Sequence, residues 1–130
     1  MYDKYMIVGE KFKNLQEGGN VTGWQLGLRL PYYRGVVLSL VGDMDITVDG
    51  EKVPVENMKL SVGGKTFPAV QLKNEPVNKW EFGEVGLLSV AKPGGLKAGE
   101  HVIRYKQHMK ISYVPGGFFG EDEKTLRIAA

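Results

Sequence analysis

The sequence contains no cysteine among its 130 residues. This absence excludes disulfides, iron–sulfur ligation and thiol catalysis. Histidine is almost as scarce, with only His101 and His108. An odd number of positions separates them, so on one strand they face opposite sides and cannot share a metal ion. We therefore expect no metal site in this chain and no catalytic residue, and each histidine is predicted to lie at the surface.

The chain also lacks a strong charge of either sign and a long hydrophobic run. Its 17 basic and 15 acidic residues give a formal charge of +2, and no basic run exists that could follow a phosphate backbone. The first apolar stretch, residues 6–8, is too short for the core of a signal peptide, and no stretch approaches a membrane span. The sequence predicts a cytoplasmic protein that binds neither nucleic acid nor membrane.

A sustained helical period is missing as well, whereas glycine is abundant, with 18 copies that include four Gly-Gly pairs. Short runs rich in Val, Ile, Leu, Tyr and Trp lie between the glycines, a pattern typical of antiparallel strands. A chain of this length can fold around one core without crosslinks. We expect an all-β protein: a single antiparallel β-sandwich of the immunoglobulin or jelly-roll kind, with little or no helix, as one domain over residues 1–130.

Several strands can be placed from the two-residue period of apolar side chains. Residues 21–30 put Trp24, Leu26, Leu28 and Leu30 on one face. Two hairpins are predicted, one at 44–48 and 52–55 around Asp49-Gly50, and one at 58–62 and 65–70 around Gly63-Gly64. Residues 101–114 are expected to form a half-buried strand or a pair of strands.

Two runs break this alternation, because residues 36–41 and 87–91 are apolar at nearly every position. One face of an antiparallel strand normally meets water and is polar. Continuous apolar runs therefore predict strands that are covered on both faces. The cover is either the protein's own loops or another subunit, and the sequence favours neither.

Aromatic residues are concentrated in two predicted loops. Residues 31–34 contain Tyr32, Tyr33 and Arg34, and the glycine-rich residues 115–120 contain Phe118 and Phe119. Aromatic residues and arginine are enriched in binding patches, and aromatic rings stack on sugars. The alternative interpretation is that one aromatic of each pair is a core anchor. The candidates for a substrate wall or a partner interface are Tyr32, Tyr33, Arg34, Trp80, Phe82, Phe118 and Phe119.

The same stretches resemble the beta subunit of bacterial C-glycoside deglycosidases over nearly the whole chain, about residues 22–128. The resemblance rests on ordered blocks rather than on a catalytic signature. The blocks are GWQLGLRLPYYRG at 23–35, LSL at 38–40, VDGEKVP at 48–54, WEFG at 80–83, PGGL at 93–96, GEH at 99–101 and ISYVP at 111–115.

The resemblance implies a division of labour between two subunits. In that family a small β-sandwich subunit assembles, as alpha–beta pairs in a hetero-oligomer, with a TIM-barrel alpha subunit that holds a divalent metal, manganese or magnesium. The substrate is a C-glycoside, such as a flavonoid C-glycoside, whose sugar 3-hydroxyl is already oxidised to a ketone. The bond between sugar and aglycone is then cleaved by elimination, a lyase-type reaction, rather than by hydrolysis.

One alternative function belongs to a different class. The chain could be a stand-alone intracellular carbohydrate-binding or scaffolding module, with Trp80, Tyr32 and Tyr33 as a stacking platform. The lack of a secretion signal counts against this alternative, since such modules usually act outside the cell. A neighbouring reading frame that encodes a TIM-barrel protein would favour the subunit.

Overall fold

The computed structural model describes residues 6–30, 35–81, 83–110 and 118–128. These residues form mainly antiparallel β-strands, together with short 3-10 helices and no α-helix, as the sequence predicts. The strands are β1 (Ile7–Glu17), β2 (Asn20–Leu28), β3 (Val36–Val37), β4 (Val41–Val48), β5 (Glu51–Lys52), β6 (Met58–Val62), β7 (Lys65–Pro68), β8 (Lys79–Trp80), β9 (Gly86–Ala91), β10 (Gly99–Met109) and β11 (Phe118–Ile128). The 3-10 helices are η2 (Leu38–Leu40), η3 (Val55–Asn57) and η4 (Ala69–Asn74).

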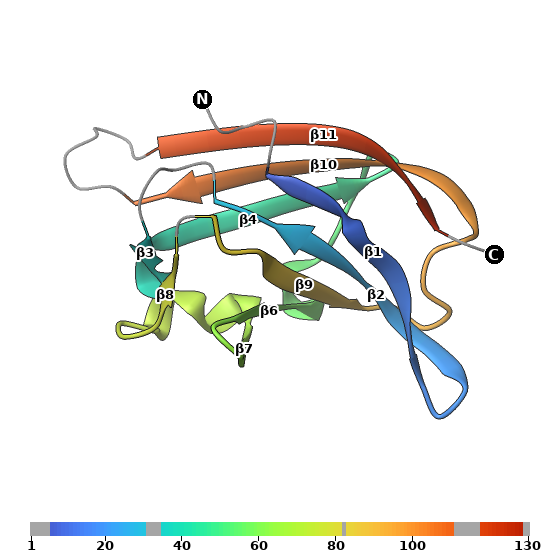
Figure 1. Cartoon of the computed structure of the whole chain (residues 1–130), viewed down its shortest axis with the longest axis horizontal. Coiled ribbons are helices and arrows are strands. Elements are labelled where there is room, and N and C mark those ends of the chain that lie inside the picture. Colours follow the sequence, from blue (N-terminus) through green and yellow to red (C-terminus); the bar gives the residue numbers. More distant parts are fainter. Residues whose placement is uncertain (1–5, 31–34, 82, 111–117, 129–130) are drawn as a thin grey trace.

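The described strands are arranged in two larger sheets and one small one (Figure 1). The five-stranded sheet has the order β1-β2-β9-β6-β7, and the four-stranded sheet has the order β11-β10-β4-β5. Strands β3 and β8 pair by themselves. The described residues contain no helix long and apolar enough to cross a membrane.

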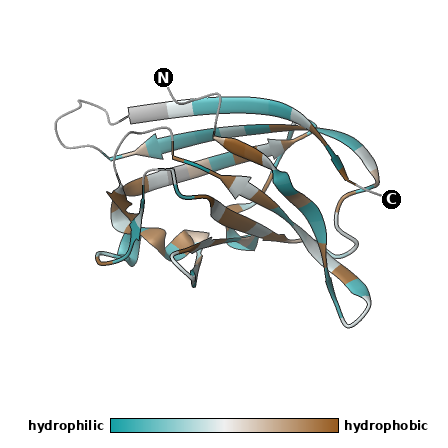
Figure 2. Ribbon diagram, viewed as in Figure 1, coloured by the Kyte–Doolittle hydropathy of each residue, from teal (hydrophilic) through white to brown (hydrophobic). Residues whose placement is uncertain are grey.

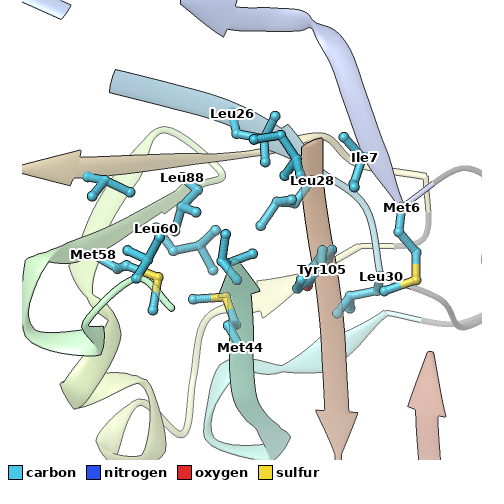
Figure 3. Packing of buried hydrophobic residues seen from close by; sticks show 14 of the residues in the cluster. Met6, Ile7, Leu26, Leu28, Leu30, Met44, Met58, Leu60, Leu88 and Tyr105 are labelled. Carbon is cyan, nitrogen blue, oxygen red and sulfur yellow. The ribbon is translucent and has the colours of Figure 1, made fainter. Parts of the chain in front are cut away.

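Both larger sheets contribute to one hydrophobic core (Figure 3). Trp24, Leu26 and Leu28 of β2 are buried there, as the predicted alternation along residues 21–30 requires. From the other sheet, Ile46 of β4 and Tyr105 of β10 are fully buried. The shared apolar cluster holds the two sheets together, since burial of apolar surface is the main driving force for packing.

Gly23 permits a close approach between two central strands. Strand β2 pairs with β9 through Gly23 and Ala91. A Cβ atom on Gly23 would lie 2.0 Å from the carbonyl oxygen of Val90, which is a backbone atom that cannot rotate away. Any side chain at this position would therefore force the two strands apart.

Both predicted hairpins are confirmed. Asp49 and Gly50 connect β4 to β5 with φ angles of 52° and 83°, and Gly63 and Gly64 connect β6 to β7 with 59° and 79°. Such left-handed conformations match the twist of tight hairpins. Strand β7 lies at the edge of its sheet. An edge strand tolerates Pro68, which has no backbone N–H to donate.

The prediction for the two apolar runs is wrong for residues 36–41. These residues form the two-residue strand β3, the 3-10 helix η2 and the first residue of β4. The tight turn directs Val36, Leu38 and Val41 into the core, whereas Leu40 remains 44% exposed. The apolar run thus reflects a change of direction rather than a strand covered on both faces.

Residues 87–91 form most of β9, which lies between β2 and β6. Leu88 and Val90 are buried in the core, Leu87 and Ser89 are half-buried, and Ala91 is exposed. The outer face of this strand is therefore partly covered by the chain itself.

A polar pair lies inside the core at an irregularity of β10. The register between β10 and β4 shifts between Gln107 and Met109. The buried hydroxyl of Tyr105 donates to Gln107 Oε1 at 2.5 Å, and Gln107 Nε2 donates to the carbonyls of Gly42 and His108. The glutamine side chain thus bridges the Tyr105 hydroxyl and two backbone carbonyls at the irregular part of the ladder.

Side chains of β11 join the edge strands of the two larger sheets. Asp122 Oδ2 accepts a hydrogen bond from the backbone N–H of Ile7 at 3.0 Å, and Lys124 Nζ donates to the Ile7 carbonyl at 2.6 Å. Figure 2 shows that β11 is largely hydrophilic, and Figure 1 shows it beside the start of β1. The seam between the sheets is therefore closed by two charged side chains instead of a backbone ladder.

Candidate partner interface

The structure places only part of the predicted aromatic set. Tyr32, Tyr33, Arg34 and Phe82 lie outside the described residues. Trp80, Phe118 and Phe119 lie on strands, at β8 and at the start of β11. The predicted wall of aromatic loops stays a prediction for the first four residues.

Trp80 is a core residue, which corrects its prediction as a surface platform. Its side chain is fully buried, and its indole N–H donates to the carbonyl of Glu84 at 2.9 Å. The Glu84 carboxylate in turn accepts the backbone N–H groups of Gly63 and Glu81. A ring enclosed in this way offers no face for a sugar, and the stacking platform of the carbohydrate-binding alternative loses one of its three members.

Phe118 and Phe119 do not lie in a loop, which is a second correction. They open strand β11, where Phe118 pairs with Met109 and Phe119 with His108. The glycines around them suggested a turn, but the backbone at Phe118, Phe119 and Gly120 is extended and pairs with β10. The two residues therefore belong to a paired strand and not to a glycine-rich loop.

The described residues form a surface groove of about 710 Å³. It lies where the start of β4, the segment after β5 and the 3-10 helices η3 and η4 meet. Its lining comprises Val41, Gly42, Met44, Asp45, Lys52, Val53, Pro54, Val55, Glu56, Ala69, Val70, Leu72, Lys73 and Lys110.

Exposed apolar side chains gather at this groove. Among the described residues five large hydrophobic side chains are exposed, and two of them, Val55 at 43% and Val70 at 44%, line it. A third, Leu40, directly precedes the lining residue Val41. Apolar patches of this kind are typical of sites for other molecules.

The groove also carries charged side chains of both signs. Lys52, Lys73 and Lys110 line it together with Asp45 and Glu56. The described part of the chain shows no ion pair for any of these five. The groove therefore combines an apolar floor with three lysines and two carboxylates, a local surplus of positive charge.

Sequence reasoning missed this groove because residues 55 and 69–70 were predicted to be ends of strands. In the structure they belong to η3 and η4, and each helix directly follows a proline, Pro54 or Pro68, in extended conformation. Proline cannot donate to a ladder, so each proline was a signal that the strand ends there.

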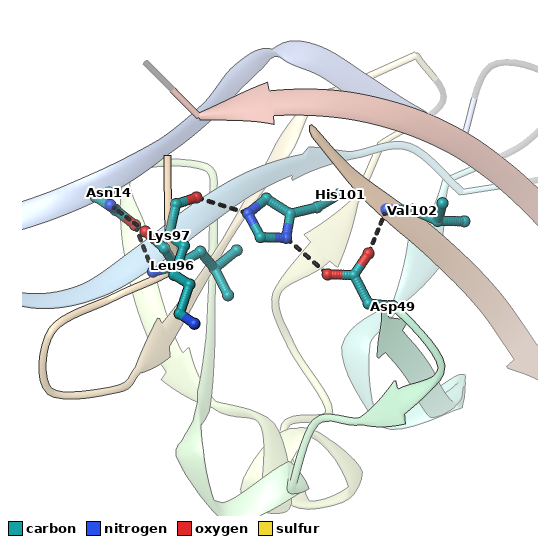
Figure 4. Close-up of polar contacts among 6 residues, drawn as sticks. All are labelled: Asn14, Asp49, Leu96, Lys97, His101 and Val102. Carbon is teal, nitrogen blue, oxygen red and sulfur yellow. Dashed lines mark hydrogen bonds and ion pairs between the residues drawn. The ribbon is translucent and has the colours of Figure 1, made fainter. Parts of the chain in front are cut away.

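A polar cluster outside the groove is centred on His101 of β10 (Figure 4). Its Nδ1 lies 2.7 Å from Asp49 Oδ2, and its Nε2 lies 2.7 Å from the carbonyl oxygen of Lys97. Asp49 Oδ1 also accepts the backbone N–H of Val102 at 2.8 Å. The ring is buried and meets Phe12 edge-on, so the prediction of a surface histidine is wrong for His101. We call His101, Asp49 and the Lys97 carbonyl the histidine latch.

The latch favours a charged imidazolium. Burial alone disfavours the charge, but the hydrogen bond to the Lys97 carbonyl and the Asp49 carboxylate together raise the pKa of His101 above its ordinary value. The hydrogen bond from Val102, followed by that from His101, lowers the pKa of Asp49. Both ring nitrogens face acceptors, so His101 is arranged to fasten a loop rather than to accept a proton from a substrate.

The described residues contain no group of three or more histidine, aspartate or glutamate side chains that could hold a metal ion. His101 and His108 lie on opposite faces of β10, one buried and one half-buried. The expectation that this chain binds no metal stays a prediction.

The sheets and the groove define a class of protein: a β-sheet protein whose surface carries an apolar groove lined by lysines. Residues 2–113 match the family described as "C-glycoside deglycosidase beta subunit". This match covers most of the sequence, and the chain belongs to that family.

Curated relatives agree with the family match. The chain is 32% identical over 114 residues to a C-glycoside deglycosidase beta subunit of Eubacterium cellulosolvens, covering 87% of this chain and 78% of that protein. A protein of the same name from Arthrobacter globiformis is 27% identical over 78% of this chain and 82% of its own length. A 3'-dehydrocarminate deglycosidase beta subunit from Microbacterium is 30% identical over 72% and 70%.

Proposed function

We propose that this chain is the accessory beta subunit of a complex that cleaves the carbon–carbon bond between sugar and aglycone in 3-oxo-C-glycosides. The family match over residues 2–113 carries this proposal. The name of the Microbacterium relative refers to a dehydrogenated glycoside, which agrees with a substrate that is oxidised before cleavage. The chemistry is assigned to a TIM-barrel alpha subunit, paired with this chain in a hetero-oligomer.

The proposed reaction is an elimination. The ketone at C3 of the sugar acidifies the C2 proton, and a base of the alpha subunit removes it to give an enolate. The enolate then re-forms the ketone, a double bond forms between C1 and C2, and the aglycone leaves from C1 and takes up a proton. A divalent metal in the alpha subunit, manganese or magnesium, would stabilise the negative charge on the ketone oxygen.

The histidine latch supports the absence of catalysis by this chain alone. A general base needs a ring nitrogen free to accept a proton from the substrate. Both nitrogens of His101 are held by Asp49 and Lys97. His108 already has a partner inside the chain.

The test is to purify this chain and a candidate TIM-barrel alpha subunit from the same source, separately and together, and to supply a 3-oxo-C-glycoside. We expect turnover only when both are present, and elemental analysis should find less than stoichiometric manganese or magnesium in this chain alone. Release of aglycone by this chain without its partner, or one tightly bound metal per chain, would contradict the proposal.

The aromatic residues Tyr32, Tyr33, Arg34, Phe118 and Phe119 are proposed to line the substrate site of the assembled complex and to exclude water from the enolate. Replacing Phe118 and Phe119 with alanine should lower kcat/KM about 10- to 100-fold while the complex stays assembled. Loss of assembly would instead make the pair an interface anchor. A lower melting temperature of the isolated chain would make it a structural anchor.

Two further points belong to the proposal. The complex is proposed to act in the cytoplasm. The fold is assigned to the immunoglobulin or jelly-roll kind of sandwich, because two antiparallel sheets share one core.

A further inference from the structure

The geometry points to the groove between β4, η3 and η4 as the docking site for an acidic segment of the alpha subunit. This inference rests on the proposed function, which supplies the partner. It adds which surface of this chain the partner covers and what chemistry the covering segment has.

The first argument is the apolar content of the groove. Val55 and Val70 expose more than two-fifths of their surface at its edge, and buried Val41, Met44 and Leu72 form part of its wall. Its volume of about 710 Å³ can receive several side chains of a partner but not a whole domain. Apolar side chains of the partner would remove these two valines from water.

The second argument is charge. Three lysines, Lys52, Lys73 and Lys110, line the groove against two carboxylates, those of Asp45 and Glu56. None of them has an ion-pair partner in the described part of the chain, so the local surplus is positive. A segment that carries aspartate or glutamate beside an apolar residue is complementary to this arrangement.

The third argument is the contrast with other exposed valines and lysines. Val102 is 41% exposed but lies on β10 and does not line the groove. Lys11 and Lys13 are exposed on β1, also outside it. Exposed valines and lysines occur together at the groove. Val102, Lys11 and Lys13 are exposed residues of the same types elsewhere, so they provide matched controls.

The experiment measures the dissociation constant between the full chain and the TIM-barrel alpha subunit that supports its turnover. Two variants alter the groove: Lys73→Glu with Lys110→Glu, and Val55→Ser with Val70→Ser. Each should weaken binding by about tenfold or more, as expected for residues near the centre of an interface. Raising the salt from about 0.05 to about 0.5 M should weaken the unaltered complex several-fold, and the lysine variant should lose most of this salt dependence.

Controls separate local from general effects. The variants Lys11→Glu with Lys13→Glu, and Val102→Ser, should bind within about twofold of the unaltered chain. Circular dichroism melting shows whether each variant is folded. The altered positions are exposed, so the two groove variants provide independent routes if one of them fails to fold.

Each outcome decides something. Groove variants that are folded and bind as tightly as the controls would overturn the docking site and leave the proposed function intact. Failure of the unaltered chain to bind the TIM-barrel protein would overturn both. Self-association of this chain that the valine variant abolishes, with binding to the TIM-barrel protein unchanged, would assign the groove to a second copy instead.

Discussion

The segment that follows β5 separates two regions that differ in how far the chain satisfies its own polar groups. Lys52, Val53 and Pro54 line both the groove of about 710 Å³ and a second hollow of about 400 Å³ next to Asp49. Around the second hollow, loops are fastened by side chains. His101 binds Asp49 and Lys97, as described above, and a further pair of hydrogen bonds nearby ties the loop before β10 to β1.

That second fastening is made by Asn14 of β1. Its Nδ2 donates to the carbonyl of Leu96 at 2.9 Å, and its Oδ1 accepts the N–H of the same residue, also at 2.9 Å (Figure 4). The groove shows the opposite pattern, with lysines that form no ion pair among the described residues and with exposed valines. The comparison teaches that the region around the second hollow satisfies its polar groups within the chain, whereas the groove is the region that we infer to be covered by a partner.

The largest effect is expected from a substitution that disturbs the five-stranded sheet, which supports the region around the second hollow. In Gly23→Ala the new Cβ would meet the Val90 carbonyl oxygen at 2.0 Å, so the pairing of β2 with β9 must shift. We expect a loss of unfolding free energy at or above about 1–3 kcal/mol, measured by urea denaturation.

Gly35→Ala is the control for that variant. Its Cβ would meet mainly the Glu81 carboxylate, the mobile end of a flexible side chain. We expect a change within about 0.5 kcal/mol. Equal effects of the two substitutions would show that the close approach at Gly23 is not the cause.

A smaller loss is expected in the core, from Tyr105→Phe. The variant removes the hydroxyl that donates to Gln107 Oε1. Burial raises the pKa of Tyr105 well above its ordinary value, so the hydroxyl is protonated throughout the working range. Losing this one hydrogen bond should cost about 0.5–1.5 kcal/mol of stability, independent of pH. Pairing Tyr105→Phe with Gln107→Leu in a double-mutant cycle would measure the coupling, and additive losses would argue against this hydrogen bond.

The smallest effect is expected for the histidine latch, whose contribution to stability depends on pH. The raised pKa of His101 means that the histidine latch contributes fully below the ordinary value of 6.5 and weakens as pH rises through the folded-state pKa. The lowered pKa of Asp49 means that its contribution is present above 3.8 and is lost as pH falls through the lowered value. Asp49→Asn should therefore reduce the melting temperature more near about pH 6 than near about pH 9.

Asparagine suits this test because it tolerates the positive φ at position 49 and keeps an oxygen for the Val102 N–H. The oxygen that faces His101 Nδ1 is replaced by an amide NH2 group, so the substitution removes both the negative charge and the acceptor opposite the imidazolium. A melting temperature that falls equally at both pH values would mean that the latch acts by shape and not by charge.

Much of the fold could be predicted from the sequence because it rests on local patterns. The alternation at residues 21–30 and the Asp49-Gly50 and Gly63-Gly64 turns need only neighbours along the chain. The apolar run at 36–41 misled because a 3-10 turn and a strand covered on both faces have the same composition.

The sites depend on contacts between distant residues and were less accessible. The histidine latch joins residues 52 positions apart, and an odd spacing of two histidines carries no information about Asp49. The groove needs η3, η4 and β4 to meet, which no local pattern encodes. The family resemblance was confirmed, because it rests on ordered blocks along the chain rather than on spatial contacts.

The charged seam between β1 and β11 has a consequence for how the chain reaches this structure. The backbone N–H and carbonyl of Ile7 form hydrogen bonds with the side chains of Asp122 and Lys124, which lie 115 and 117 positions later in the chain. During synthesis the first hairpin emerges early, yet its outer edge stays open until nearly the whole chain has left the ribosome. Contacts of such long range slow folding, and an open strand edge is a site for pairing with other chains. The rate at which β11 arrives therefore sets how long each new molecule is exposed to aggregation before it can meet its partner.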